Sequence, residues 1–334
     1  MLRFEYYHDN WLDIIPYTKG EPDLTTNLTV DFFRSLKFDS ETLKTYRKNA
    51  VNRLLPMLGD KPALCFSGGI DSQATWQCFN DAGVDIDVYV LVFKNDLNLQ
   101  DVSSAINFAE YKKLKINFIE IDILNFLSRE NAAYSQKYKS LSPQFNTHYK
   151  LCDILRSKGY TGFVHGGGSP MLAANIGAWI SNYNRNFLNY INYSEVTGTL
   201  CQGNFLGSDP HLAWAITLLT PTFINEHYNK NAVYKEEHDL FEYQRYLDKI
   251  KGYRASGFDI IPQERKYTGF ELVKVELEKR YGDGWAFEKF YRYPLKQYAK
   301  DIDIVVHLSD DLIDEIKRLN FENFRPSVDA PTGI

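Results

Sequence analysis

The chain has 334 residues, of which 44% are hydrophobic and 24% are charged, a composition typical of a soluble globular protein. Its formal net charge of −5 excludes the overall basic character of many nucleic-acid-binding proteins, although a local basic patch stays open. No apolar run reaches the roughly 18 residues of a membrane-spanning helix, and the first residues lack the apolar core of a secretory signal. We therefore expect a cytoplasmic protein without a membrane partner.

The first 60 residues combine turn signals with one clear helix, predicted from Ser40 to Met57. Ser40 is a suitable N-cap, and Leu43, Tyr46 and Ala50 follow at helical spacing. A break at 59–62 separates this N-terminal segment, residues 1–60, from the next part of the chain.

Strands and helices then alternate. Strands are predicted at 63–66, 87–93, 116–121 and 160–165, and helices at 72–82, at 101–114 and, with a break at Ser142, up to residue 158. Strands separated by helices of this length indicate parallel βαβ units. The predicted fold is therefore an α/β domain at 61–225 with a doubly wound parallel sheet, followed by a mainly helical C-terminal region at 226–334. The pattern becomes mainly helical from about residue 208, with periodic segments near 209–227, 232–250, 268–281 and 309–319.

A glycine pair with flanking serines stands where the first predicted strand passes into a helix. The six residues are Ser67, Gly68, Gly69, Ile70, Asp71 and Ser72. Open parallel sheets bind ligands beyond the carboxyl ends of their strands, and glycines let the backbone approach an anion. The N–H groups of this turn and of the helix start would form a phosphate nest. The alternative is a turn in which Asp71 or Ser72 only caps the helix.

Asp71 conflicts with a bound phosphate, because two negative charges repel each other. A Mg²⁺ ion between the carboxylate and the phosphate oxygens would remove this conflict, so we expect Asp71 to be a metal ligand.

The turn resembles the S-G-G-x-D-S loop of the PP-loop ATP pyrophosphatases, an adenine nucleotide alpha hydrolase-like superfamily that includes asparagine synthetase and several tRNA-modifying enzymes. The resemblance implies that ATP and Mg²⁺ bind here, and that the enzyme cleaves the α–β bond and transfers AMP to a substrate oxygen. It also implies that the adenine lies near the end of the second strand, at Leu91, Val92 and Phe93.

A second glycine cluster, Gly166, Gly167 and Gly168, follows the fourth predicted strand. The segment around it is similar to the S-G-E-G-A-D-E-L region of asparagine synthetase-type enzymes, which implies that its backbone N–H groups line the nucleotide crevice. A turn needed only for close packing is the alternative. Pro170 and Met171 stand where that family has acidic residues, so this resemblance supplies no second metal ligand.

Cations near the phosphates would stabilise the charge that develops during adenylation. We expect Lys266 and Arg254, with Arg292 as a third candidate, to serve as catalytic cations, and solvated surface charges are the alternative for each. The segment 198–210, bordered by Asp209 and His211, is predicted to be a loop that could close over a substrate.

The four cysteines contain no C-x-x-C pair, so the sequence predicts neither a disulfide framework nor a zinc site. Cys65 and Cys78 lie in apolar segments and are expected to be buried, inert thiols. Cys152 and Cys201 flank the second glycine cluster. Either they act in sulfur transfer, as cysteines near the adenylate do in some relatives of this superfamily, or they are two separate buried thiols. His165, which ends the fourth strand, is a catalytic candidate or a packed histidine.

The leading hypothesis is an AMP-forming ligase, asparagine synthetase-like but without a glutaminase domain, that activates a small acid for amide formation. Residue 2 is Leu2 rather than a nucleophilic cysteine, so the amine or ammonia would come from an external donor. The alternatives are a PP-loop tRNA- or nucleobase-modifying enzyme, with nucleic acid as the partner, and a non-catalytic nucleotide-binding scaffold. We expect both glycine clusters to flank one crevice, and the C-terminal region to cover it and bring cations from 254–292 toward it. The alternative is that the C-terminal helices pack on the far side of the sheet, as an oligomerisation or partner surface.

Overall fold

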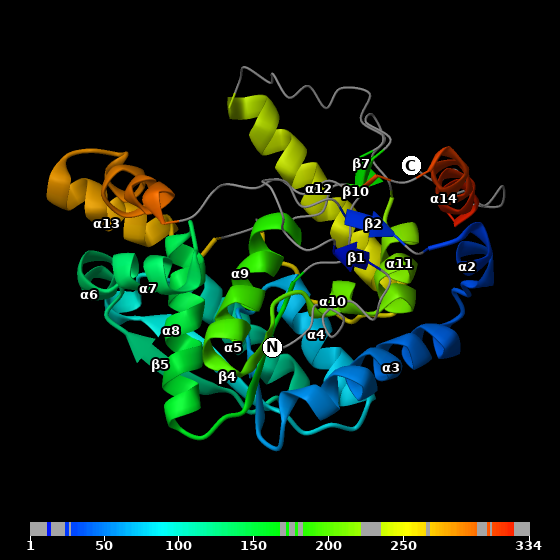
Figure 1. The fold of residues 1–334 in the computed structure, drawn as a ribbon, viewed down its shortest axis with the longest axis horizontal. Helices are drawn as coiled ribbons and strands as arrows, with labels where there is room; N and C mark the ends of the chain where they lie inside the picture. Colours follow the sequence, from blue (N-terminus) through cyan, green and yellow to red (C-terminus); the bar gives the residue numbers. More distant parts are fainter. Residues whose placement is uncertain are drawn as a thin grey trace.

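A computed structural model of the chain describes residues 12–14, 24–26, 28–167, 172–173, 178–179, 183–221, 235–264, 268–298, 306–307 and 309–323. At its centre, a five-stranded sheet is covered by helices on both faces (Figure 1). No helix in this part of the chain is long and apolar enough to cross a membrane.

All neighbouring strands of the central sheet are parallel. In spatial order they are β5 (Asn117–Ile121), β4 (Asp87–Phe93), β3 (Pro62–Cys65), β6 (Gly162–His165) and β9 (Leu200–Gln202). The chain begins in the middle with β3, moves outward through β4 to β5, and then returns to the other side of β3 with β6. The direction of winding therefore reverses between β3 and β6, which is where sheets of this kind bind ligands.

Both faces of the sheet are buried, because side chains alternate along each strand. Leu64 and Phe66 point into one core, whereas Ala63 and Cys65 point into the other. The first core is covered by α3 (Ser40–Leu58), α4 (Ile70–Asp81) and α5 (Leu99–Lys112). The second is covered by α6 (Ile123–Arg129), α7 (Asn131–Tyr138), α8 (Pro143–Ser157) and α9 (Tyr183–Thr197).

The remaining helices are α2 (Val30–Ser35), α10 (Phe205–Ser208), α11 (Pro210–Leu218), α12 (Lys235–Ala255), α13 (Glu271–Tyr281) and α14 (Asp310–Asn323), with the short segments η1 (Lys94–Asp96), η3 (Glu288–Arg292) and η4 (Tyr293–Gln297). A second sheet has the order β1 (Leu12–Ile14), β2 (Leu24–Thr26), β10 (Val306–His307), β8 (Ala178–Trp179) and β7 (Leu172–Ala173). An ion pair of 3.3 Å between Arg34 and Glu315 joins α2 to α14.

The structure confirms the predicted α/β class, the doubly wound parallel sheet and the mainly helical C-terminal region. One detail is wrong: the N-cap of α3 is Asp39 rather than Ser40, and its carboxylate accepts a hydrogen bond of 3.0 Å from the N–H of Thr42. The division at residues 60 and 225 stays a prediction of chain organisation.

The prediction of a loop at 198–210 is also wrong. This segment contains the edge strand β9 and helix α10, and nearly all of its residues from Leu200 onward are buried. Asp209 is the N-cap of α11 and accepts a hydrogen bond of 2.8 Å from the N–H of Leu212, while His211 packs on Phe32. The strand was not predicted because it has only three residues, and because one of them, the buried Gln202, is polar and therefore resembles a loop residue in the sequence.

Candidate nucleotide site

The two glycine clusters meet at the point where the winding of the sheet reverses. Cys65 and His165 are register partners in β3 and β6, so the turns that follow them leave the same edge of the sheet. A Cβ atom added to Gly166 would lie 2.5 Å from both Cα and N of Ser72, and one added to Gly167 would lie 2.5 Å from the carbonyl oxygen of Gly203. Residues about a hundred positions apart thus form one surface, as predicted; Gly168, Pro170 and Met171 lie outside the described residues.

Gly68 fixes the first turn against α5. Its φ of +76° is unfavourable for a residue with a side chain, and a Cβ here would lie 2.8 Å from Cα of Ala105. Its carbonyl oxygen accepts hydrogen bonds from Gln73 Nε2 at 2.7 Å and from Ser104 Oγ at 2.9 Å. The turn therefore depends on glycine for both its conformation and its packing.

Helix α4 begins at this turn without a side-chain cap. Its N-cap is Gly69, and neither Asp71 nor Ser72 serves as the cap. Ser72 Oγ instead donates to the carbonyl oxygen of Gly69 at 2.8 Å and lies 3.3 Å from Ser67 Oγ. A helix start with no side-chain cap offers backbone N–H groups and a positive dipole end to an anion.

Asp71 faces two polar groups of α12. Lys249 Nζ lies 2.7 Å from Oδ1 and 2.8 Å from Oδ2, and the Tyr253 hydroxyl donates to Oδ1 at 2.6 Å. Lys249 and Tyr253 are four residues apart, so they lie on one face of the helix. Sequence reasoning missed both: Lys249 lies near the end of the segment predicted to be helical at 232–250, and Tyr253 lies just beyond it. The lysine neutralises the carboxylate that we expected to bind Mg²⁺.

The C-terminal region covers this edge of the sheet, as predicted. The Gln73 side chain donates to the carbonyl oxygen of Ile261 at 2.9 Å and accepts from its N–H at 2.8 Å. Further along, Phe270 packs against Phe93 at the end of β4, with ring centroids 5.3 Å apart. Segments that follow α12 are therefore attached to both α4 and β4.

A half-buried carboxyl group, that of Asp101, lies one turn of α5 before Ser104. Burial, with a contribution from the charge of Glu271, raises the pKa of Asp101 from 3.8 to about 7. Gly269 is adjacent, since a Cβ there would lie 2.5 Å from Asp101 Oδ2. A shifted carboxyl group near a site is a candidate for proton transfer. No sequence pattern marks Asp101, because its environment depends on Glu271 and Gly269 from a distant segment.

The predicted cations lie in different places. Arg254 is exposed at the end of α12. Hydrogen bonds from Lys112 and Tyr111 lower the pKa of Asp259, and the charge of Arg254 makes a smaller contribution in the same direction. Arg292 in η3 pairs with Glu288 at 3.5 Å. Lys266 lies outside the described residues. The lysine that the structure brings to Asp71 is Lys249, and the roles of Arg254, Arg292 and Lys266 stay predictions.

The end of β4, where we expect the adenine, is engaged by the buried Asn98. Its amide nitrogen donates to the carbonyl oxygen of Leu91 at 2.8 Å, and its amide oxygen accepts from the N–H of Phe93 at 2.7 Å. These backbone groups are thus already paired, and the adenine contacts predicted for Leu91, Val92 and Phe93 remain to be tested.

No protein-family profile matches the chain, and no curated protein sequence does. Among solved structures, the U34-tRNA thiolase NcsA from Methanococcus maripaludis with its [4Fe-4S] cluster aligns over 85% of this chain and 89% of its own. The identity is 11% and the TM-score 0.36, so the match indicates neither substrate nor chemistry for this chain.

Proposed function

We propose that this chain binds ATP with its phosphates on the turn from Ser67 to Ser72 and transfers AMP to an acceptor oxygen. The observation that carries the proposal is the contact of Gly166 with Ser72, which joins two glycine turns beside the uncapped start of α4. Such a surface of backbone N–H groups suits an extended phosphate chain. The resemblance of the turn to the PP-loop ATP pyrophosphatases supports α–β cleavage rather than release of the terminal phosphate.

In this reaction, the acceptor oxygen attacks the α-phosphorus and forms a new P–O bond. The bond from the α-phosphorus to the α–β bridging oxygen breaks, and pyrophosphate leaves with the electron pair. Negative charge grows on the pyrophosphate, which the backbone N–H groups of the turn and the Lys249 ammonium would stabilise. Lys249 is suitable because it lies within 2.8 Å of both Asp71 oxygens, beside the turn.

Asp71 offers oxygen ligands of the kind that Mg²⁺ binds together with phosphate oxygens and water. The donor set therefore fits the ion, which would neutralise phosphate charge when bound. Because Lys249 contacts both oxygens, the ammonium would have to share the carboxylate with the ion or move toward the phosphates. Either arrangement keeps a cation between Asp71 and the nucleotide.

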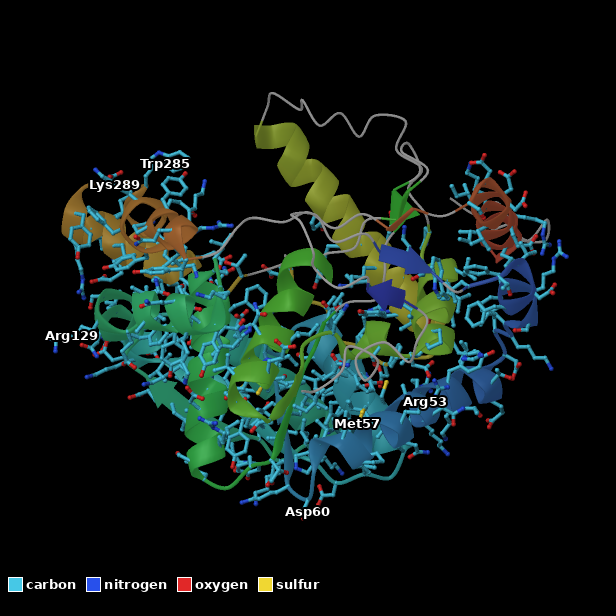
Figure 2. The ribbon with its side chains drawn as sticks, viewed as in Figure 1. Arg53, Met57, Asp60, Arg129, Trp285 and Lys289 are labelled. Carbon is cyan, nitrogen blue, oxygen red and sulfur yellow. The ribbon has the colours of Figure 1, made fainter. Side chains whose placement is uncertain are left out.

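A small acid is the acceptor that the asparagine synthetase-like resemblance favours, but one surface favours a nucleic acid. Four aromatic side chains on the α13–η4 segment are exposed: Tyr281 at 53%, Trp285 at 67%, Phe290 at 46% and Tyr293 at 50%. Lys289 and Lys296 lie over two of these rings, and Figure 2 shows Trp285 and Lys289 at one end of the molecule. Exposed aromatics among basic side chains can stack on unpaired bases.

The same segment adjoins the proposed nucleotide site. Phe287 packs on Phe270 with centroids 5.4 Å apart, and Phe270 in turn packs on Phe93. A nucleic acid stacked on these aromatics would therefore lie next to the carboxyl edge of the sheet, which supports a base-modifying activity as the second candidate.

Pyrophosphate release from ATP, screened with carboxylates, amino acids and bulk tRNA, tests both candidates. Stimulation by a small acid supports the ligase, and stimulation by tRNA supports nucleic-acid modification. In the second case, Trp285→Ala should lower the stimulation, whereas Phe118→Ala, which removes an exposed aromatic from β5, should not. ATP binding without any pyrophosphate release would instead support the scaffold hypothesis.

A further inference from the structure

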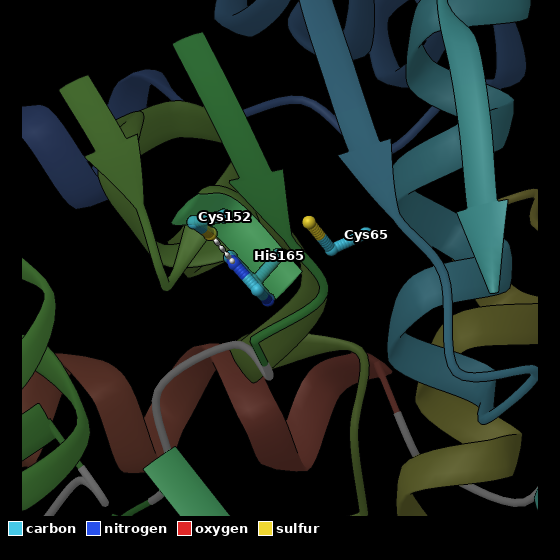
Figure 3. Close-up of side chains that lie close together, drawn as sticks. All are labelled: Cys65, Cys152 and His165. Carbon is cyan, nitrogen blue, oxygen red and sulfur yellow. Dashed lines mark hydrogen bonds between the residues drawn. The ribbon is translucent and has the colours of Figure 1, made fainter. Parts of the chain in front are cut away.

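Three sulfur atoms and an imidazole converge directly behind the two glycine turns. Cys65 ends β3 and His165 ends β6, and because they are register partners their side chains emerge side by side on the same face of the sheet. Cys152 comes from α8, which covers that face (Figure 3). The ligand atoms of these three residues all lie within 4.8 Å of one another, and no side chain is more than 7% exposed.

Cys201 supplies the third sulfur. It lies in β9, the next strand after β6, and its Sγ is 3.9 Å from Sγ of Cys152. The Cys152 Sγ is also 3.4 Å from Nε2 of His165. The cluster therefore joins four elements of the fold, β3, β6, β9 and α8, around the Cys152 sulfur.

These separations are compatible with a bound metal ion. Zinc–sulfur bonds of about 2.3 Å and zinc–nitrogen bonds of about 2.0 Å place neighbouring ligand atoms roughly 3.5 to 3.8 Å apart. The separation of 3.4 Å from Cys152 Sγ to His165 Nε2 lies close to this range, and the Cys65 sulfur completes a group within 4.8 Å to which Cys201 does not belong. Two cysteines and one histidine are a known set of three protein ligands for zinc, and thiolates favour such soft ions over Mg²⁺.

The surroundings fix the orientation of the imidazole. His148 stacks on His165 with ring centroids 5.2 Å apart, and its Nδ1 lies 2.7 Å from the hydroxyl of Tyr190. The Tyr190 ring also packs on His165, with centroids 4.8 Å apart.

We propose that Cys65, Cys152 and His165 bind one zinc ion, beside the thiol of Cys201. The sequence does not reveal this cluster, because its three residues lie up to 100 positions apart and the parallel register of β3 and β6 brings two of them together. The ion ties the ends of β3 and β6 to each other, and with them the turns that begin at Ser67 and Gly166. This site requires no nucleotide and is independent of the proposed ATP chemistry.

Zinc content of the purified full chain, with and without added Zn²⁺, tests the proposal. The chain should hold one zinc per molecule, and Co²⁺ in its place should give the strong visible absorption of tetrahedral thiolate coordination. Cys152→Ser should lower the affinity at least tenfold. Cys78→Ser is the matched control, because Cys78 is equally buried but lies in α4 on the other face of the sheet.

A second variant guards against misfolding of Cys152→Ser. Cys65→Ser removes the other sulfur ligand and should keep the far-ultraviolet circular dichroism of the wild type, while changing the Co²⁺ spectrum and weakening Zn²⁺ binding at least tenfold. A chelator should lower the melting temperature of the wild type and of Cys78→Ser, but not that of the two cluster variants. Three results would overturn the assignment. The wild type could bind no zinc, it could hold iron and sulfide instead of zinc, or both cluster variants could bind zinc with unchanged affinity.

Discussion

The ends of β3 and β6 separate two groups of polar side chains that differ in charge and in origin. In front of the turns, Asp71 meets Lys249 and Tyr253, a charged group whose carboxylate and ammonium are partly exposed. Behind them, Cys65, Cys152 and His165 form a buried cluster of two sulfur atoms and an imidazole. A charged and partly solvated group can exchange partners with phosphate and Mg²⁺, whereas a buried sulfur cluster can accept only a dehydrated, soft cation.

The two groups also differ in how they are built. The rear cluster depends on strand register, because Cys65 and His165 pair across the sheet, so it forms when the sheet forms. The front group depends on the docking of α12, whose Lys249 follows Asp71 by 178 residues. Substitutions that disturb the turn should therefore affect both groups, and those in α12 should affect only the front one.

The largest effect is expected from Gly68→Ala, which changes the turn itself. The new Cβ would meet the backbone of Ala105 and would sit at a φ of +76°, so the free energy of unfolding should fall by about 3 kcal/mol. Gly83→Ala is the matched control, since Gly83 has a φ of +72° but no atom within 4 Å of the added Cβ. Its loss should be about 1 kcal/mol. Equal losses in urea unfolding would show that strain alone matters.

Asp101→Asn should make stability less sensitive to pH. With a pKa raised from 3.8 to about 7, folded Asp101 binds a proton more tightly than the unfolded chain does, so its contribution to stability falls as pH rises from about 4 to 7. Asparagine has no such penalty. The stability gained by the variant over wild type should be about 2 kcal/mol larger at pH 8 than at pH 5. Parallel curves of melting temperature against pH would contradict the shifted carboxyl group.

Lys249→Met should weaken ATP binding about tenfold, a loss of about 1.4 kcal/mol, because the cation beside the phosphates is removed. Zinc content should not change, which separates the front group from the rear cluster. Lys251→Met is the control, since Lys251 lies on the same helix but pairs with Asp248 at 3.1 Å. Isothermal titration with ATP and Mg²⁺ measures both variants, and equal affinities in the two would remove Lys249 from the site.

The smallest effect is expected from Tyr253→Phe, which removes one hydrogen bond to Asp71 and leaves the ion pair in place. ATP affinity should fall by about threefold, consistent with a net hydrogen-bond contribution of roughly 0.5 to 1.5 kcal/mol. The same titration checks this value. A loss larger than that of Lys249→Met would mean that the hydroxyl, rather than the ammonium, positions the carboxylate.

The sequence predicted the part of the site that is local. Gly68 and Gly69 mark the turn, and the alternation of strands and helices places it at the carboxyl edge of a parallel sheet. Contacts between distant segments were beyond such patterns. Lys249 looks like any lysine of an amphipathic helix until α12 docks on α4, and Cys201 lies in a three-residue strand that gives no periodic signal. The expectation that the chain has no zinc site rested on the spacing of the cysteines along the chain, which does not report their spacing across the sheet.

The most direct test of the central claim is the identity of the nucleotide products when the chain turns over ATP with Mg²⁺ and an accepted substrate. Chromatography should find AMP and pyrophosphate in equal amounts with wild type. Asp71→Asn should keep the fold but lose most of the Mg²⁺-dependent ATP affinity and with it this turnover. Accumulation of ADP and phosphate, or an Asp71→Asn variant that turns over like wild type, would contradict adenylyl transfer at the turn from Ser67 to Ser72.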